Sequence, residues 1–179
     1  MGALSKEAPL FNLDPSTFIL REATPAEKIS CWRANSTSWA GKLTVEDYIG
    51  RESVSGSGEL LRDGGIKYWV FASPPHPPPS NTSGSATDGK HEVIYAAVET
   101  LKKAVAVKTS DGFSIESCWA VASVFTPLQY RGNKVAAWMM NRLGEWIDSE
   151  EARCRFSVLF SDVGVSIGRS VCSCVSCSM

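Results

Sequence analysis

The hydrophobic pattern of the chain changes its period around residues 127–133. Residues 118–126 form an apolar run, and Pro127 stops it, which predicts a strand that ends there. Beyond the turn, apolar residues recur at the three- and four-residue spacing of a helix that is buried on one face. These residues are Val135, Trp138, Met139, Leu143, Trp146 and Ile147. The pattern therefore predicts a strand, a tight turn and a helix in succession.

Other elements follow from shorter signals. A helix is predicted to begin at Pro25 behind a Thr24 cap, and another at Thr44 with Asp47 three residues on. Asp111-Gly112 predicts the turn of an antiparallel hairpin. Strands are predicted at residues 17–21, 66–72, 113–126 and 156–160, with one or two strands within 92–107. Antiparallel strands followed by a parallel strand-helix-strand unit predict an α/β fold, a mixed and mostly antiparallel sheet flanked by helices.

The predicted turn has the features of an anion site. The first backbone N–H groups of a helix lack intrahelical partners and lie at the positive end of its dipole. We expect Asn133 to be the N-cap and Gly132 to allow a close approach of a ligand. Arg131 and Lys134 add two positive charges. A pyrophosphate group would suit this turn.

Bulk properties favour one domain with a small ligand. The chain has 179 residues, with 18 basic and 19 acidic side chains and a net charge of −1. This balance does not favour nucleic acid or an anionic membrane as the main partner. With no long apolar segment and no secretory signal in the sequence, we expect a cytoplasmic protein. Cys31, Cys118 and Cys154 lie in apolar segments and are expected to be reduced thiols.

The run from Tyr130 to Ala136 resembles the acetyl-CoA-binding signature of the GCN5-related N-acetyltransferases. That signature has Arg or Gln, two residues, Gly, one residue, and Gly or Ala. Arg131 and Ala136 match it, whereas Lys134 occupies the usual glycine position. The Lys134 side chain would either crowd a phosphate or pair with it, and the sequence leaves both alternatives open.

A wider resemblance, over about residues 18–164, is to the fungal lysine N-acetyltransferases of lysine catabolism. It rests on six segments: Leu20 to Thr24, Tyr68 to Val70, Glu99 to Lys102, Val121 to Pro127, Met139-Met140 and Val158 to Gly164. The resemblance implies acetyl transfer from acetyl-CoA, without a metal, to an amine, the side-chain amine of free lysine. It also implies the acyl-CoA N-acyltransferase fold.

The resemblance also implies roles for individual residues. Backbone groups of Val124, Phe125 and Thr126 would bind the pantetheine arm and the thioester oxygen, in the manner of an oxyanion hole. The pyrophosphate would lie on the amides of Arg131, Gly132, Asn133, Lys134, Val135, Ala136 and Ala137. Trp32, Trp39 and Tyr48 are candidates for acceptor contact, and the alternative is that they are core aromatic residues.

A lysine ammonium must lose its proton before it can react. Glu99 and Glu116 are the carboxylates that we expect to assist this step. The alternative is that each is a solvated charge on a strand.

The segments outside this pattern have other compositions. We expect a flexible lead at residues 1–16, an acetyltransferase domain at 17–164 and a disordered insertion at 73–90. The insertion contains the proline run 74–79, which is either a tolerated hairpin connection or a motif for a polyproline-binding partner.

The resemblance stops after Gly164. We expect residues 165–179 to be a tail foreign to the family, translated from an intron, so that the domain is incomplete at its C-terminus. A rival reading takes Cys172, Cys174 and Cys177 of this tail as a metal or lipid site. The alternative to an active enzyme is therefore an inactive fragment, or a non-catalytic module that binds coenzyme A or a protein.

Overall fold

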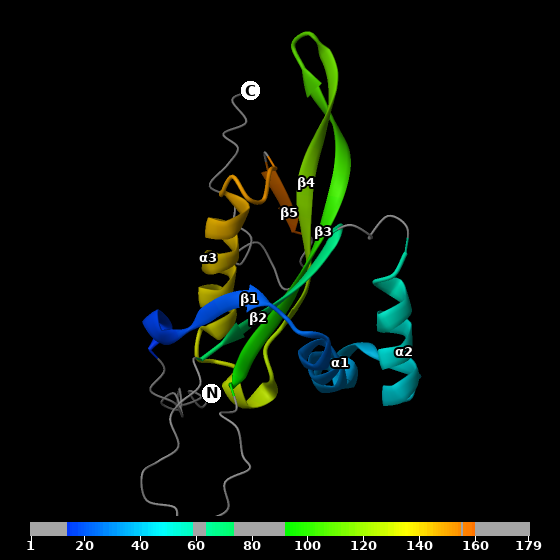
Figure 1. Ribbon diagram of the computed structural model, residues 1–179, viewed down its shortest axis with the longest axis vertical. Coiled ribbons are helices and arrows are strands. Elements are labelled where there is room, and N and C mark those ends of the chain that lie inside the picture. Colours follow the sequence, from blue (N-terminus) through cyan, green and yellow to red (C-terminus); the bar gives the residue numbers. More distant parts are fainter. Residues whose placement is uncertain (1–13, 59–63, 74–91, 155, 160–179) are drawn as a thin grey trace, which may run out of the picture.

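The computed structural model describes residues 14–58, 64–73, 92–154 and 156–159 (Figure 1). Five strands form one sheet in the order β1-β2-β3-β4-β5, in which β5 runs parallel to β4 and the other neighbours are antiparallel. The strands are β1 (Ile19–Glu22), β2 (Ile66–Ala72), β3 (Ile94–Thr109), β4 (Gly112–Phe125) and β5 (Phe156–Leu159). This topology confirms the predicted mixed, mostly antiparallel sheet.

The hairpin of β3 and β4 is the longest feature of the sheet. The two strands pair from Ala97 with Phe125 to Thr109 with Gly112, as the Asp111-Gly112 signal predicts. The segment predicted as one or two strands is a single strand, β3, of 16 residues. In Figure 1 the hairpin extends well beyond its neighbouring strands.

Helices α1 (Pro25–Trp39) and α2 (Val45–Ser55) begin where their capping residues predict. Thr24 and Glu27 form a reciprocal capping box at α1, with Pro25 as the first helical residue. Thr44 accepts a hydrogen bond from the backbone N–H of Asp47 at the start of α2. Local side-chain chemistry is enough to set both starts, because each cap joins residues three positions apart.

Strand β1 begins two residues later than predicted. Pro15–Thr17 form a short 3-10 helix, η1, because the Asp14 side chain accepts a hydrogen bond from the N–H of Ser16. Residues 14–16 of the predicted flexible lead are therefore part of a capped turn. Residues 1–13, residues 74–90 of the predicted insertion with its proline run, and the predicted tail at 165–179 lie outside the described residues. Ser73, the first residue of the predicted insertion, is not disordered, because it is buried and its backbone N–H donates to the carbonyl oxygen of Val93.

Helix α3 (Val135–Ile147) covers one face of the sheet, and α1 and α2 lie on the other side (Figure 1). The predicted apolar face of α3 is confirmed, since Val135, Met139, Leu143 and Ile147 are buried. They pack on the side chains of one face of the strands, which include Trp69, Phe71, Val98 and Val121. The smaller opposite cluster consists of Ala23, Cys31, Tyr68, Val70 and Ala97.

The described part of the chain has two further properties relevant to the sequence analysis. Cys31, Cys118 and Cys154 are free thiols, as expected. None of the helices formed by the described residues has the length and apolar character needed to cross a bilayer.

Candidate functional site

A bulge interrupts β4 close to its end. Ala97 pairs with Phe125 but Glu99 pairs with Ala122, so Ser123 and Val124 together stand opposite the single residue Val98. Ser123 has a φ of 54°, in the left-handed region that residues with a side chain rarely adopt. The extra residue breaks the regular pairing of β4 and leaves backbone groups available near Val124. The resemblance to the acetyltransferases implies that these groups bind an acyl donor.

The turn before α3 differs from the prediction at its N-cap. Lys134, not Asn133, is the N-cap residue, and α3 begins at Val135. The side-chain nitrogen of Asn133 donates to the carbonyl oxygens of Tyr130 and Arg131, so it braces the turn and does not cap the helix. The cause is the backbone path: Gly132 and Lys134 both have left-handed conformations, with φ of 82° and 61°.

The first backbone N–H groups of α3 can donate hydrogen bonds to a ligand. The N-cap makes no side-chain hydrogen bond to the helix, so the leading N–H groups of α3 have no side-chain partner there. Asn133 Oδ1 is also buried without a hydrogen-bond partner. Space next to Gly132 is open, because a Cβ added there would meet no atom within 4 Å. An anionic group fits this donor set.

Arg131 is turned back toward the end of β4. Its Nε donates to the carbonyl oxygen of Thr126 at 2.9 Å, and its guanidinium carbon lies 5.8 Å from the centre of the Phe125 ring. The arginine therefore ties the turn to the end of the strand, and its guanidinium lies beside Phe125. Thr126 Oγ1 is buried without a hydrogen-bond partner.

Glu99 lies on the face of the sheet that α1 and α2 cover, beside the bulge. Its Oε2 accepts a hydrogen bond of 2.9 Å from Ser123 Oγ. Burial raises the pKa of Glu99, the charge of Glu52 on α2 raises it further, and the Ser123 hydrogen bond and Lys28 on α1 lower it. A carboxylate with a raised pKa next to polar neighbours is suited to accept a proton near neutral pH.

Trp32 and Tyr48, two of the three predicted acceptor-binding aromatic residues, lie near this carboxylate. The Trp32 indole is near enough to lower the pKa of Glu99 slightly, although its Nε1 is outside full hydrogen-bond geometry. Tyr48 is buried, and the charge of Glu99 helps to raise its pKa after the larger effect of burial. The third, Trp39, is 39% exposed and meets the ring of Phe125 edge-on at 5.7 Å.

Tyr68 also lies beside Glu99, although the sequence did not mark it as a candidate site residue. It pairs with Glu99 across β2 and β3, and its ring meets that of Trp32 edge-on at 5.9 Å. Its hydroxyl is buried without a hydrogen-bond partner, and burial raises its pKa. The alternation of β2 places Tyr68 on the same face as Val70, but only the pairing with β3 brings it to Glu99.

The structure does not bring Glu116 to this group. Glu116 pairs with Val105 toward the tip of the hairpin, while Glu99 pairs with Ala122. The two pairs are six positions apart along β4, which is roughly 20 Å along a strand. Ser114 Oγ donates to Glu116 Oε1 at 3.0 Å.

An apolar pocket of about 190 Å³ lies between α1 and the ends of β3 and β4. Its lining includes Cys31 and Ala34 of α1, Ala97 of β3 and Phe125 of β4. Burial raises the pKa of Cys31 to about 12, so this thiol stays protonated and is a poor nucleophile. The pocket can hold methylene groups next to the bulge.

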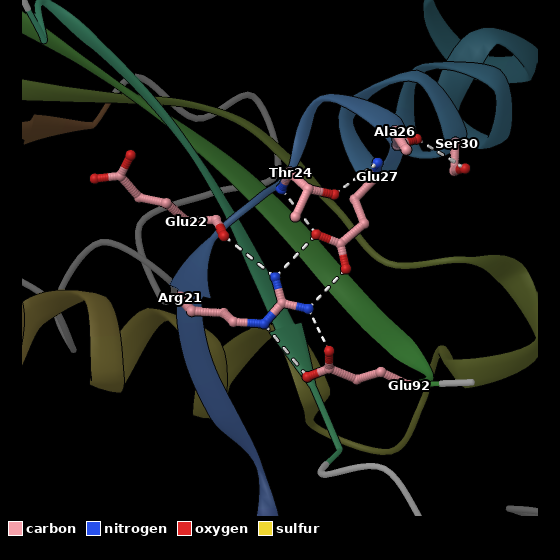
Figure 2. A network of polar contacts seen from close by, with 7 residues as sticks. All are labelled: Arg21, Glu22, Thr24, Ala26, Glu27, Ser30 and Glu92. Carbon is pink, nitrogen blue, oxygen red and sulfur yellow. Dashed lines mark hydrogen bonds and ion pairs between the residues drawn. The ribbon is translucent and has the colours of Figure 1, made fainter. Parts of the chain in front are cut away.

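A polar network fixes the start of α1 against the sheet (Figure 2). The Arg21 guanidinium on β1 pairs with Glu27 through two hydrogen bonds, of 2.9 and 2.6 Å, and also with Glu92. Hydrogen bonding to Arg21 lowers the pKa of Glu27 to about 2. Because Glu27 also closes the capping box with Thr24, this network positions the helix that carries Trp32.

The chain combines a five-stranded mixed sheet, a bulge in β4 and a helix start without a side-chain cap, and this arrangement matches the acyl-CoA N-acyltransferase fold. Comparison with solved structures supports this class. A predicted acetyltransferase from Clostridium acetobutylicum, solved with acetyl-CoA, has a TM-score of 0.52 and 14% identity, covering 90% of this chain and 93% of that one. A transcriptional regulator from Bacillus halodurans has a TM-score of 0.53 and 15% identity, covering 81% and 82%.

The chain thus has the fold of the GCN5-related N-acetyltransferase superfamily that its sequence resembles. Among curated proteins, a lysine acetyltransferase from Yarrowia lipolytica is 28% identical over 130 residues. The match covers 72% of this chain and 29% of that protein, so this chain corresponds to less than a third of its length. No protein family model matches the chain.

Proposed function

We propose that the chain carries an acetyl-CoA-dependent N-acetyltransferase site whose acceptor is a primary amine, the side-chain amine of lysine. The observation that carries the proposal is the position of Glu99, a buried carboxylate hydrogen-bonded to the bulge of β4. A proton acceptor therefore lies beside the backbone groups that suit a thioester. The name of the Yarrowia relative supports lysine as the acceptor.

The residues present fit the donor that this proposal requires. The free amides at the start of α3, with Arg131 and Lys134, would hold the pyrophosphate of acetyl-CoA. Backbone groups from Val124 to Thr126 would hold the pantetheine arm and donate to the thioester oxygen. Acetyl-CoA would supply the acetyl group as a thioester, and the amine nitrogen would form the new C–N bond as the C–S bond breaks. The second proton that leaves the nitrogen would end on the sulfur of the departing coenzyme A, which is released as the thiol.

Glu99 takes the proton of the acceptor ammonium in this proposal. Its carboxylate attracts the cation, and its raised pKa makes it a stronger base than an ordinary glutamate. Three aromatic side chains, those of Trp32, Tyr48 and Tyr68, lie near it, which suits a cationic amine on a methylene chain. Lys28 and Glu52, which also act on Glu99, suit the carboxylate and the α-ammonium of a free amino acid.

A panel of acceptors tests the proposed substrate. The chain is incubated with acetyl-CoA and an amine, and thiol release and N-acetylated product are followed. Lysine, cadaverine, which lacks the carboxylate, and 6-aminohexanoate, which lacks the α-ammonium, are compared at equal concentration. We expect lysine to react fastest. Equal rates for all three would refute lysine specificity, and binding of coenzyme A without turnover would favour the non-catalytic module.

The matched variants Glu99→Gln and Glu116→Gln test the assignment of the base. We expect Glu99→Gln to lower kcat by roughly 10²- to 10⁴-fold, because a positioned base contributes about that much. In the parent, kcat should rise as Glu99 loses its proton, at a pH above the usual carboxyl range because its pKa is raised. Glu116→Gln should keep the parent profile. An unchanged profile in Glu99→Gln would remove Glu99 from the reaction.

Cytoplasmic location and a polyproline-binding partner remain predictions from the sequence. The proline run lies outside the described residues. A pull-down with isolated polyproline-binding domains, compared between the parent and a chain in which residues 74–79 are replaced by Gly and Ser, would test the partner.

A further inference from the structure

Ser123 combines two features that a strand residue rarely has together. It has a left-handed backbone with a φ of 54°, which strains a residue that carries a Cβ. Its hydroxyl also donates to Glu99 Oε2 across the sheet at 2.9 Å. Glycine is the usual residue at a left-handed bulge position, because it has no Cβ to strain. A serine there supplies a hydroxyl that glycine would lack.

The hydrogen bond joins the two halves of the candidate site. Glu99 belongs to the acceptor side, facing α1 and α2, whereas Ser123 is the first residue of the bulge that adjoins Val124. If the bulge were regularised, Ser123 would take an extended backbone and its side chain would leave its present direction. The Ser123 hydroxyl therefore reaches Glu99 because the bulge is formed.

We propose that Ser123 is a positioning residue, which fastens the Glu99 carboxylate to the bulge so that the base and the acyl-donor groups keep one fixed arrangement. The role of Ser123 in catalysis rests on the proposed function, whereas the hydrogen bond between Ser123 and Glu99 does not depend on it. Ser123 takes no proton in the reaction, and its hydroxyl donates to the ionised carboxylate and stabilises that form.

A measurable consequence follows for the titration of Glu99. Other groups that act on this carboxyl come from three elements: Lys28 and Trp32 on α1, Tyr48 and Glu52 on α2, and Tyr68 on β2. Burial and Glu52 raise the pKa of Glu99, and the Ser123 hydrogen bond is the largest of the effects that lower it. Removal of the hydroxyl should therefore move the pKa of Glu99 still higher.

Two variants separate the hydroxyl from the backbone. Ser123→Ala removes the hydroxyl and keeps the Cβ strain, whereas Ser123→Gly removes the hydroxyl and relieves the strain. The Glu99 carboxyl carbon is followed by ¹³C NMR against pH, with its resonance assigned by its loss in Glu99→Gln. We expect the titration to move to higher pH in both variants. Ser114→Ala, which breaks the similar contact with Glu116, should leave it in place.

The inference is overturned if Glu99 titrates at the parent pH in both variants, or if only one of them moves, since the backbone would then be the cause. Kinetics add a second readout: the acid limb of the kcat profile should shift with the titration, while KM for the amine changes little. If no amine on the panel is acetylated, the proposed function fails, but the NMR titration still decides the contact. If lysine is acetylated and the titration stays unmoved, the inference alone fails.

Discussion

The two faces of the sheet differ in the polar side chains that they bury. On the α3 face, the indoles of Trp69 and Trp119 donate to Thr100 Oγ1 and to the Ala152 carbonyl oxygen, each at 2.9 Å, whereas Trp146 Nε1 and Ser117 Oγ have no hydrogen-bond partner. On the α1 and α2 face, the Tyr68 hydroxyl and the Trp32 indole are buried without hydrogen-bond partners. The second face also holds Glu99, and burial raises the pKa of this side chain.

This difference indicates that one face contributes mainly to stability and the other to the candidate site. A buried polar group without a partner costs about 1–3 kcal/mol, so each such group needs an explanation, and use by a ligand or a reaction is one. The α3 face instead buries large apolar side chains, such as Met139 and Leu143, which have no exposed surface. We infer that the α3 face stabilises the fold and that the opposite face gives up stability for the site.

The largest expected effect is on the α3 face. Leu143→Ala should lower the free energy of unfolding by about 3 kcal/mol, because it removes a fully buried side chain and leaves a cavity. Urea unfolding followed by circular dichroism measures the change. Leu128→Ala, at a leucine that is 77% exposed, is the control and should change it by less than about 0.5 kcal/mol. Equal losses in the two variants would contradict the division between the faces.

An intermediate effect is expected where α1 is tied to the sheet. Glu27→Gln should lower the free energy of unfolding by about 1–2 kcal/mol at pH 7, because it weakens the pair with Arg21 and the capping box. The folded pKa of Glu27, about 2, is below its ordinary value of 4.5, so its contribution is present above pH 4.5 and is lost as the pH falls toward 2.

Urea unfolding at a series of pH values checks this prediction. The stability of the parent and of Glu27→Gln should converge as the pH falls through that window. Glu46→Gln is the matched control, because its pair with Arg33 is largely exposed and contributes little. A difference between parent and Glu27→Gln that is the same at every pH would contradict the role of the ion pair.

The smallest expected effect is at the turn between β4 and α3. Lys134→Gly should raise the free energy of unfolding by about 1 kcal/mol, because a left-handed residue with a φ of 61° becomes a glycine. Gly132→Ala, at a φ of 82°, should have the opposite sign. Thermal unfolding measures both, and destabilisation by Lys134→Gly would show that the side chain stabilises the turn.

The same variant decides what Lys134 does to a ligand. Calorimetric titration with coenzyme A should give tighter binding in Lys134→Gly if the side chain crowds the phosphate, and weaker binding if the ammonium pairs with it. Measuring at two salt concentrations distinguishes the second case, since a charge pair weakens with salt.

Much of the fold could be predicted because its signals are local. The Thr24 and Thr44 caps, the helical period of α3 and the Asp111-Gly112 turn each depend on residues a few positions apart. The N-cap of α3 was predicted wrongly as Asn133, because its amide braces the preceding turn and Lys134 takes a conformation typical of glycine. Composition carries no signal for a lysine in that conformation.

By itself, the sequence determined the order of strands and helices and the turn before α3, because periodicity and capping act within a few residues. Only the tertiary structure decided that Glu99, and not Glu116, meets the bulge, and that Tyr68 and Ser123 belong to the same site. The reason is that these contacts depend on the register of neighbouring strands. A shift of one residue would turn each of these side chains to the other face of the sheet.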